Sequence, residues 1–269
     1  GTSFCGTSNY TTVITQQSEV DALAGCTSFL GSLRIEGPNI NNVDSLVNLT
    51  TIEDDLSIQY ILANGNDLPA LSLTQVQGEL QIVSSSFDNI LFPSLTHIDD
   101  NLKIERTKLD SLNFESLASV QNIQFGPYNG YNPSDGSGSY FALNTFNSLN
   151  SMGTLRIEDN TGAPYSANNF GLHHIGGFSN LQICGLLEVD DNHLLTSCCK
   201  LLDLSAAASS ITINNNGTNC GSLLAAASVC GTSFCGTSNY TTVITQQSEV
   251  DALAGCTSFL GSLRIEGPN

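Results

Sequence analysis

Basic residues are scarce in this 269-residue sequence: 7 Lys and Arg stand against 25 Asp and Glu, and the formal net charge is −18. Nucleic acids and anionic membrane surfaces are bound through basic patches, so this balance argues against both as partners. No apolar run approaches the roughly 18 residues that span a bilayer, and no membrane insertion is expected in this segment. The opening residues also lack the charged and apolar regions of a signal peptide.

Motifs of known catalytic chemistry are missing as well. The sequence contains no G-x-S-x-G, no H-E-x-x-H and no phosphate-binding glycine loop. Paired carboxylates, Asp54-Asp55 and Asp99-Asp100, fall in turns, where solvation explains them. Calcium binding is the alternative, although these pairs lack the alternating oxygen ligands of a calcium loop. We predict that the protein is not an enzyme, has no catalytic residues and needs no cofactor.

One cluster of histidine and cysteine was weighed as a metal site, because its members lie about one short repeat apart. It comprises His173, His174, His193, Cys198 and Cys199. Zinc sites usually use C-x₂-C or H-x₃-H spacings, which this cluster does not contain. We therefore predict no metal site, and we assign these cysteines to disulfides and these histidines to the surface.

The sequence repeats itself over a long period. Residues 231–269 match residues 1–39 without a mismatch. Chance does not produce such a match, and old duplications drift apart, so recent copying within an array is the favoured explanation. We interpret the chain as one complete unit, residues 1–230, followed by the start of the next identical unit, residues 231–269. An artificial overlap is the alternative.

Cysteines lie near the two ends of the unit and are absent from its middle, as expected for disulfide-bonded end caps of a secreted repeat domain. We predict the pairs Cys5–Cys26 and Cys220–Cys230, with Cys184 bonded to Cys198 or Cys199. The odd cysteine is either buried or bonds another chain. The disulfide candidates are Cys5, Cys26, Cys184, Cys198, Cys199, Cys220, Cys230, Cys235 and Cys256.

Three N-x-[S/T] sequons, at Asn9, Asn48 and Asn216, are compatible with N-glycosylation and a secretory route. Together with the cysteines they predict an extracellular or cell-surface location. Two short helices are expected at the ends of the unit. Ser18 caps the first helix, which stops at Gly25, and Cys220 and Cys230 bracket the second.

A shorter period runs through the unit. An apolar-x-apolar triplet recurs every 21–24 residues, with two steps of 32. Alternation predicts a short strand with one buried face, and stacking such segments gives parallel strands around a shared core. Polar corners such as Asp191-Asn192 and Asn214–Asn216 follow the strands, where Asn and Asp tolerate left-handed backbone. The triplets are Leu33/Ile35, Leu56/Ile58, Leu80/Ile82, Leu102/Ile104, Ile123/Phe125, Leu155/Ile157, Leu187/Val189 and Ile211/Ile213.

The two long steps contain insertions, residues 126–144 and 160–177, each following a strand. Successive segments of a stack are neighbours, so both loops should emerge side by side on one flank. Aromatic, histidine and asparagine side chains gather there outside the repeat pattern. The candidate ligand or subunit contacts are Tyr128, Tyr131, Tyr140, Tyr165, Asn168, Phe170, His173 and His174.

The triplet spacing, the upstream ladder of the form S-L-x-x-L-x-x-I-x-x-x-L-x-I and the cysteine-bounded ends resemble the receptor L domain. The opening Glu19–Cys26 and the close Asn215–Cys220 are similar to L-domain-like repeats of secreted or surface proteins of microbes. The resemblance covers nearly all of residues 1–230. It implies a mainly-β fold, a right-handed β-helix or leucine-rich-repeat-like solenoid with short helical caps. It implies no receptor signalling, because cysteine-rich modules, a kinase segment and a membrane helix are missing from the sequence.

Two functions are expected from these features. The first is a structural unit of an extracellular filament, stalk or surface fibre, with identical units of the same and neighbouring chains as partners. The second is a multivalent adhesin that binds carbohydrate or a cell-surface protein through the loops 126–144 and 160–177.

Overall fold

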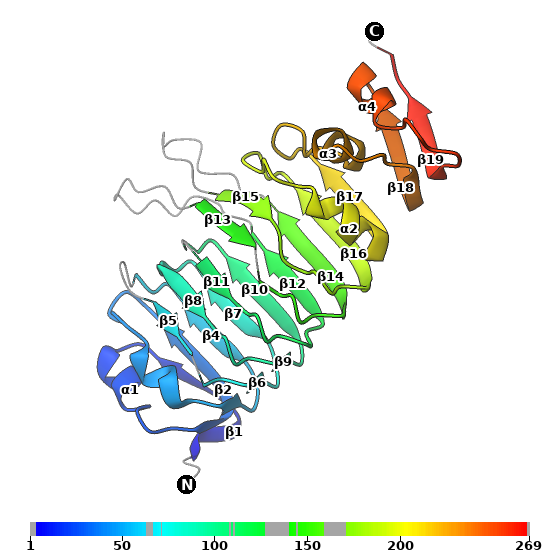
Figure 1. Ribbon diagram of the computed structural model, residues 1–269. Helices are drawn as coiled ribbons and strands as arrows, with labels where there is room; N and C mark the ends of the chain where they lie inside the picture. Colours follow the sequence, from blue (N-terminus) through cyan, green and yellow to red (C-terminus); the bar gives the residue numbers. More distant parts are fainter. Residues whose placement is uncertain are drawn as a thin grey trace.

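The computed structural model describes residues 4–62, 67–70, 72–107, 109, 111–126, 140–143, 145–158 and 171–267. The fold is mainly β with parallel sheets, as the triplet pattern predicts (Figure 1). The elements are β1 Phe4–Ile14, α1 Gln17–Asp21, β2 Ser28–Glu36, the 3-10 helix η1 Asp44–Asn48, β3 Thr51–Ile52, β4 Leu56–Gln59, β5 Leu68–Pro69, β6 Gln75–Val76, β7 Leu80–Val83, β8 Asn89–Leu91, β9 His97–Ile98, β10 Asn101–Glu105, β11 Ser111–Asn113, β12 Asn122–Phe125, β13 Tyr140–Leu143, β14 Ser151–Glu158, β15 Gly171–Ile175, β16 Ile183–Asp190, α2 Lys200–Ala207, β17 Ala208–Asn214, α3 Leu223–Cys230, β18 Gly236–Ile244, α4 Gln247–Asp251 and β19 Leu260–Ile265.

The largest sheet has twelve strands and contains all eight triplets. Its strands pair in parallel in the order β17-β16-β14-β12-β10-β7-β4-β2-β3-β6-β9, and β1 pairs with β2. The register aligns equivalent triplet positions: Leu33 lies opposite Leu56, Leu56 opposite Leu80, and Leu80 opposite Leu102. Because side chains alternate along a strand, this alignment places every triplet on the same buried face.

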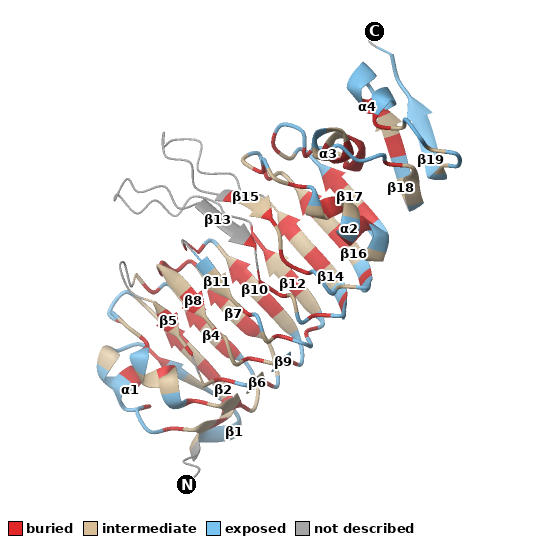
Figure 2. Ribbon diagram, in the orientation of Figure 1, coloured by how far each residue is buried: buried red, intermediate tan, exposed pale blue. Residues whose placement is uncertain are grey.

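Two smaller parallel sheets complete residues 1–230. The order in one is β11-β8-β5, and the other is the pair β13-β15. Residues of β5, β8, β13 and β15 belong to the same buried cluster as the large sheet (Figure 2). The core is therefore continuous from one end of the unit to the other.

Stacked phenylalanines run through this core. Phe92, Phe114, Phe146 and Phe178 are all buried, and the ring centroids of neighbours lie 5.2, 5.4 and 5.1 Å apart. Their planes are within 19° of parallel. Each segment thus contributes one phenylalanine ring of the upstream ladder, and each ring stacks face to face on the ring of the neighbouring segment.

Left-handed backbone marks the corner that follows the strands of the large sheet. The residue directly after the strand has positive φ in seven cases: two are Gly37 and Gly126, and the other five are not glycine. Asp191 and Asn215 confirm the prediction that Asp and Asn form these corners. The five are Tyr60 (φ 55°), Ser84 (φ 50°), Arg106 (φ 50°), Asp191 (φ 56°) and Asn215 (φ 47°).

The next residue along the corner turns its side chain inward to satisfy backbone carbonyls. The Ser85 hydroxyl donates to the Val83 carbonyl at 2.9 Å, and that of Thr107 donates to Glu105 at 2.9 Å. Asn192, which is fully buried, donates through Nδ2 to the carbonyls of Asp190 and Ile157, both at 2.9 Å. These short polar side chains pair carbonyl groups that the buried corner would otherwise leave without donors.

The N-terminal end of residues 1–230 differs in detail from the sequence expectation, and the C-terminal end agrees with it. Residues 4–14 form strand β1, which the Ser/Thr/Gly-rich composition did not indicate. The N-cap of helix α1 is Gln16 and not Ser18. The Glu19 carboxylate accepts hydrogen bonds from the backbone amides of Thr15 and Gln16 at 2.8 and 3.0 Å, as in a capping box. At the other end, the expected helix between Cys220 and Cys230 is present as α3.

Residues 236–265 adopt the same local structure as residues 6–35. The pair β18–β19 has the register of β1–β2, with Thr241 opposite Ser262 as Thr11 lies opposite Ser32. Helix α4 has the capping box of α1. Equal sequence thus forms equal local structure in both copies.

Candidate functional site

The two insertions are brought together, as their positions in the sequence predict. Strand β13 lies at the end of the first insertion and pairs in parallel with β15, near the end of the second, with Tyr140 opposite Gly171. The residues Tyr128, Tyr131, Tyr165, Asn168 and Phe170 lie outside the described part of the chain, as does the side chain of Tyr140. Only His173 and His174 of the predicted contacts can therefore be placed by their side chains.

These two histidines are half-buried and make contacts within the protein. The His174 ring Nδ1 lies 2.6 Å from the Ser197 hydroxyl, and the His173 carbonyl accepts from the backbone amides of Thr196 and Ser197, both at 3.1 Å. Burial lowers the pKa of His173, so its ring stays neutral at physiological pH. The His174 side chain and the His173 backbone carbonyl thus attach β15 to the following segment.

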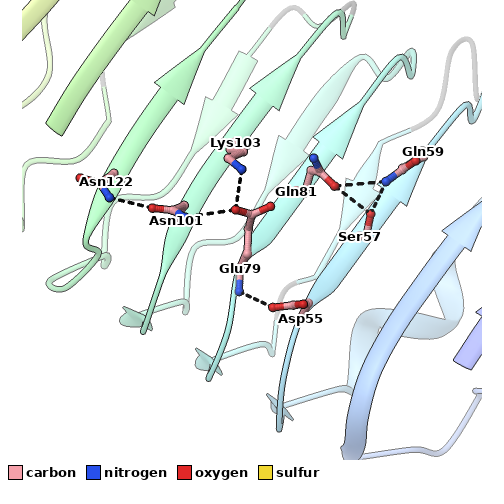
Figure 3. Close-up of polar contacts among 8 residues, drawn as sticks. All are labelled: Asp55, Ser57, Gln59, Glu79, Gln81, Asn101, Lys103 and Asn122. Atoms are coloured by element: carbon pink, nitrogen blue, oxygen red, sulfur yellow. Dashed lines mark hydrogen bonds and ion pairs between the residues drawn. The ribbon is translucent and has the colours of Figure 1, made fainter. Parts of the chain in front are cut away.

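A second candidate surface is the outward face of the large sheet, which is covered by polar side chains from successive strands (Figure 3). Glu79 is its centre: the Lys103 ammonium lies 2.8 Å and the Asn101 amide 3.2 Å from the same carboxylate oxygen. Asn122 then donates to Asn101 at 2.8 Å. Hydrogen bonds thus run from strand to strand across the sheet, and they hold these side chains in fixed positions.

Basic side chains on this face are each matched by a carboxylate. Arg156 Nε lies 2.7 Å from Glu188 and 3.1 Å from Glu158, and its hydrogen bond to Glu188 raises the pKa of the guanidinium. Burial raises the pKa of Glu105, an effect that Lys103 and Arg106 partly offset. A depression of about 260 Å³ lies between Lys103 and Arg156. Its lining residues are Asn101, Lys103, Asn122, Ile123, Gln124, Thr154 and Arg156.

This face was not among the sequence predictions. Its signal lies in the middle position of each triplet, which points away from the core and is occupied by polar residues throughout. The middle residues are Arg34, Ser57, Gln81, Lys103, Gln124, Arg156, Glu188 and Thr212, and all eight are half-buried.

The third candidate surface is the junction between residues 1–230 and the second copy. Tyr240 of β18 packs against the core of the preceding unit, and burial raises the pKa of its phenol, while a backbone hydrogen bond with Leu223 acts in the opposite direction. A groove of about 490 Å³ lies beside it. It is lined by Ile211, Thr212, Ile213, Asn214, Gly221, Ser222, Tyr240, Thr241 and Val243.

Comparison with known proteins adds no relative from which a role could be transferred. No protein-family model, curated protein or solved structure matches the chain. What the three surfaces can do must therefore be argued from their own chemistry. Among the described residues, no three His, Cys, Asp or Glu side chains gather as metal ligands would. In the same part of the chain, no helix is long and apolar enough to cross a membrane.

Four disulfides bind the ends of the units. The predicted bond Cys5–Cys26 is formed, and Cys235–Cys256 repeats it in the second copy. Disulfides of this number indicate an oxidising environment, as found in secreted and extracellular proteins.

The other two predicted pairs are wrong. Cys220 bonds Cys198 rather than Cys230, and Cys230 bonds Cys199. The adjacent cysteines stand where the chain enters α2, and each meets a different partner on the segment that follows. Both bonds therefore link successive segments, and neither Cys198 nor Cys199 is available to bind a metal.

Cys184 is the free cysteine, which corrects its assignment to a disulfide. It lies in β16 opposite Met152 of β14 and is only 1% exposed. Its position is that of the apolar ladder residues Ile98 and Met152, so the thiol serves as a small core side chain. Burial raises its pKa, and this disfavours the reactive thiolate. A covalent link between chains through this thiol, the second of the two fates considered above, is not supported.

A thiol-labelling experiment tests this assignment. We expect Cys184 to be unreactive towards iodoacetamide in the native protein, because the reagent requires an accessible thiolate. In denaturant with the disulfides intact, one label per chain is expected, and Cys184→Val should remove it. Rapid native labelling, or a dimer on a non-reducing gel that Cys184→Val abolishes, would contradict the buried role.

The three sequons are not equivalent in the structure. Asn9 and Asn48 are exposed, whereas Asn216 is half-buried. The Asn216 Nδ2 donates to the Val189 carbonyl at 2.8 Å, and its Oδ1 accepts from the Asn192 backbone amide at 3.1 Å. The geometry favours Asn9 and Asn48 as glycan acceptors.

Proposed function

We propose that the protein is a structural unit of an extracellular filament, stalk or surface fibre built from tandem copies of residues 1–230. The observation that carries the proposal is the second copy. It begins directly after Cys230, repeats 39 residues without a change, and packs against the end of the first unit. A structural array needs identical units with a defined junction, because each unit must fit an identical neighbour.

We further propose that each unit is a right-handed β-helix of the L-domain type. The parallel register between successive segments, the phenylalanine stack and the repeated corners support this interpretation. In such a stack each segment contacts chiefly its neighbours, and a disulfide-bonded cap at each end limits fraying. Neither feature requires an enzymatic role, and we propose none.

Negative-stain microscopy of the native material tests the structural role. We expect elongated particles with a regular axial repeat that corresponds to one unit. Isolated compact particles, or a parent sequence that contains a single unit, would remove the fibre proposal.

An adhesive role is the second proposal, and the pairing of β13 with β15 favours it, because this pairing places the bases of both insertions at one flank. Repetition of such a flank would turn weak binding into strong attachment. A glycan array probed with the intact protein tests it, with mutants of Tyr128 and Tyr165 as the specificity check. Absence of binding to any glycan would remove the carbohydrate version.

A further inference from the structure

One stretch of sequence occurs in two environments in this molecule, so the burial of identical residues can be compared between them. In the structure, the first copy, residues 1–39, packs against the later strands of its own unit. The second copy, residues 231–269, packs against the end of the preceding unit. Any difference in burial between equivalent residues therefore reports on the neighbours and not on the sequence.

Some residues are less buried in the second copy. Leu33 and Ile35 are 0% exposed, whereas the equivalent Leu263 and Ile265 are 43% and 70% exposed (Figure 2). Leu33 and Ile35 lie beside Leu56 and Ile58 of β4 on the buried face of the sheet, whereas among the described strands β19 pairs with β18 alone. Their exposure identifies the face that each segment turns towards its own core.

Other residues change in the opposite direction. Tyr10 is 65% exposed and Val13 is 47% exposed, but the equivalent Tyr240 and Val243 are half-buried. Glu19 and Ala22 are likewise exposed in the first copy, whereas their equivalents Glu249 and Ala252 are 7% and 8% exposed. These residues form a second face, which is covered only when a unit stands in front of it.

The covering surface in the second copy is the end of the preceding unit. Tyr240 reaches Leu223 at the start of α3 and lines a groove with Ile211 and Ile213 of β17. Helix α4 lies against α3, and a depression between them is lined by Ala227 and Ser228 on one side and by Ser248, Asp251 and Ala252 on the other. The contact therefore combines β18 and α4 on one side with β17 and α3 on the other.

The buried carboxylate on this face is already satisfied within its own segment. Glu249 accepts from the backbone amides of Thr245 and Gln246 at 2.7 and 3.1 Å. Glu19 makes the same contacts in the first copy, where it is exposed. Because these hydrogen bonds precede any docking, covering the carboxylate leaves none of its main partners unpaired.

We propose that the face formed by Tyr10, Val13, Glu19 and Ala22 is a docking surface, and that its occupant is the β17–α3 end of another copy of this unit. The inference rests on the proposed tandem function and names the contact that joins one unit to the next. Within one chain the preceding unit supplies the partner. Between chains the same surface forms a head-to-tail contact, which is heterologous and leaves a free end for further addition.

In the chain described here the β17–α3 end is already covered by residues 231–269. An intramolecular partner has an effective concentration in the millimolar range, so it outcompetes a second chain at ordinary concentrations. Substitutions in residues 231–269 that weaken their contact with the β17–α3 end should therefore make this end accessible to residues 1–39 of another molecule. This difference between the two copies allows the test to be made with the full chain.

The test compares full-length variants by sedimentation across a concentration series that reaches the millimolar range. The double variant Tyr240→Ser/Val243→Ser is expected to associate as concentration rises, more strongly than the unchanged chain. Adding Tyr10→Ser should return it to a monomer, whereas adding Tyr60→Ser, a change at another exposed tyrosine, should not.

Two outcomes would overturn the proposal. One is a double variant that stays monomeric over the whole series, and the other is association that persists after Tyr10→Ser is added. The same comparison distinguishes docking from misfolding. Any misfolding caused by the double change would be present in every variant that contains it, and the resulting aggregation would not depend on Tyr10. Failure here would leave the microscopy of native material unaffected, so the docking surface and the tandem array are tested separately.

Discussion

Replacing Phe114 with alanine is expected to lower the free energy of unfolding by about 4 kcal/mol. Phe114 is fully buried and stacks on Phe92 at 5.2 Å and on Phe146 at 5.4 Å. The change opens a cavity in the middle of the stack and removes two ring contacts, each worth about 1 kcal/mol beyond area burial. Guanidinium unfolding with the disulfides intact, followed by circular dichroism, measures the loss.

Two further variants separate the stack from general effects of substitution. Phe114→Leu retains most of the volume and should cost on the order of 1.5 kcal/mol. Tyr10→Ala removes an aromatic ring that is 65% exposed and should change stability by less than about 0.5 kcal/mol. Equal losses for Phe114→Ala and Tyr10→Ala would show that the stack is not a continuous core.

The second large effect is expected for Asn192→Asp, which should cost about 3 kcal/mol or more at neutral pH. Asn192 is 0% exposed, and its Nδ2 group donates to the carbonyls of Ile157 and Asp190 and to Asn216 Oδ1. A carboxylate in this place directs an oxygen at the three acceptors that the Nδ2 group now serves. Two effects therefore disfavour the charged carboxylate: the loss of hydration on burial and the repulsion from the surrounding oxygens.

The loss should depend on pH in a defined direction. Burial raises the pKa of the introduced carboxyl in the folded state above its unfolded value of about 4. The folded state then binds the proton more tightly, so the variant is least destabilised below pH 4 and loses stability as pH rises through the folded-state pKa. Denaturation of Asn192→Asp and the original chain at pH 4 and pH 7 gives this difference. Asn214→Asp, at an exposed corner position, is the matched control and should show little loss at either pH.

Local pattern was sufficient to predict the strands, because alternation has a direct physical cause. The triplets Leu102/Ile104 and Ile123/Phe125 each place two apolar side chains on one face, and such a face must be buried. Their recurrence at similar spacing predicted that they would align, and the register of β10 with β12 confirms it. The corner at Asp191-Asn192 was predictable for a similar reason, since Asn and Asp tolerate left-handed backbone and bond nearby groups.

Pairings that depend on position in space were not predictable in this way. Cys198 and Cys199 are adjacent in sequence, yet their side chains reach Cys220 and Cys230 respectively. Cys184 seemed a disulfide candidate only because its place in the ladder went unrecognised. The outward row that includes Lys103 and Arg156 was likewise missed, because its ion pairs to Glu79 and Glu188 join strands that are 24 to 32 residues apart.

The amino-acid sequence by itself determined the periodic strands, their buried faces and the identity of residues 231–269 with residues 1–39. These features follow from side-chain chemistry repeated along the chain, and they need no knowledge of what lies nearby. Only the tertiary structure decided which cysteines bond, which polar groups meet across the sheet, and which face of the repeated segment is covered. Leu33 and Leu263 have the same sequence around them, but one is 0% and the other 43% exposed. The difference comes from the neighbouring strand, because burial is a property of the surroundings of a residue and not of the residue alone.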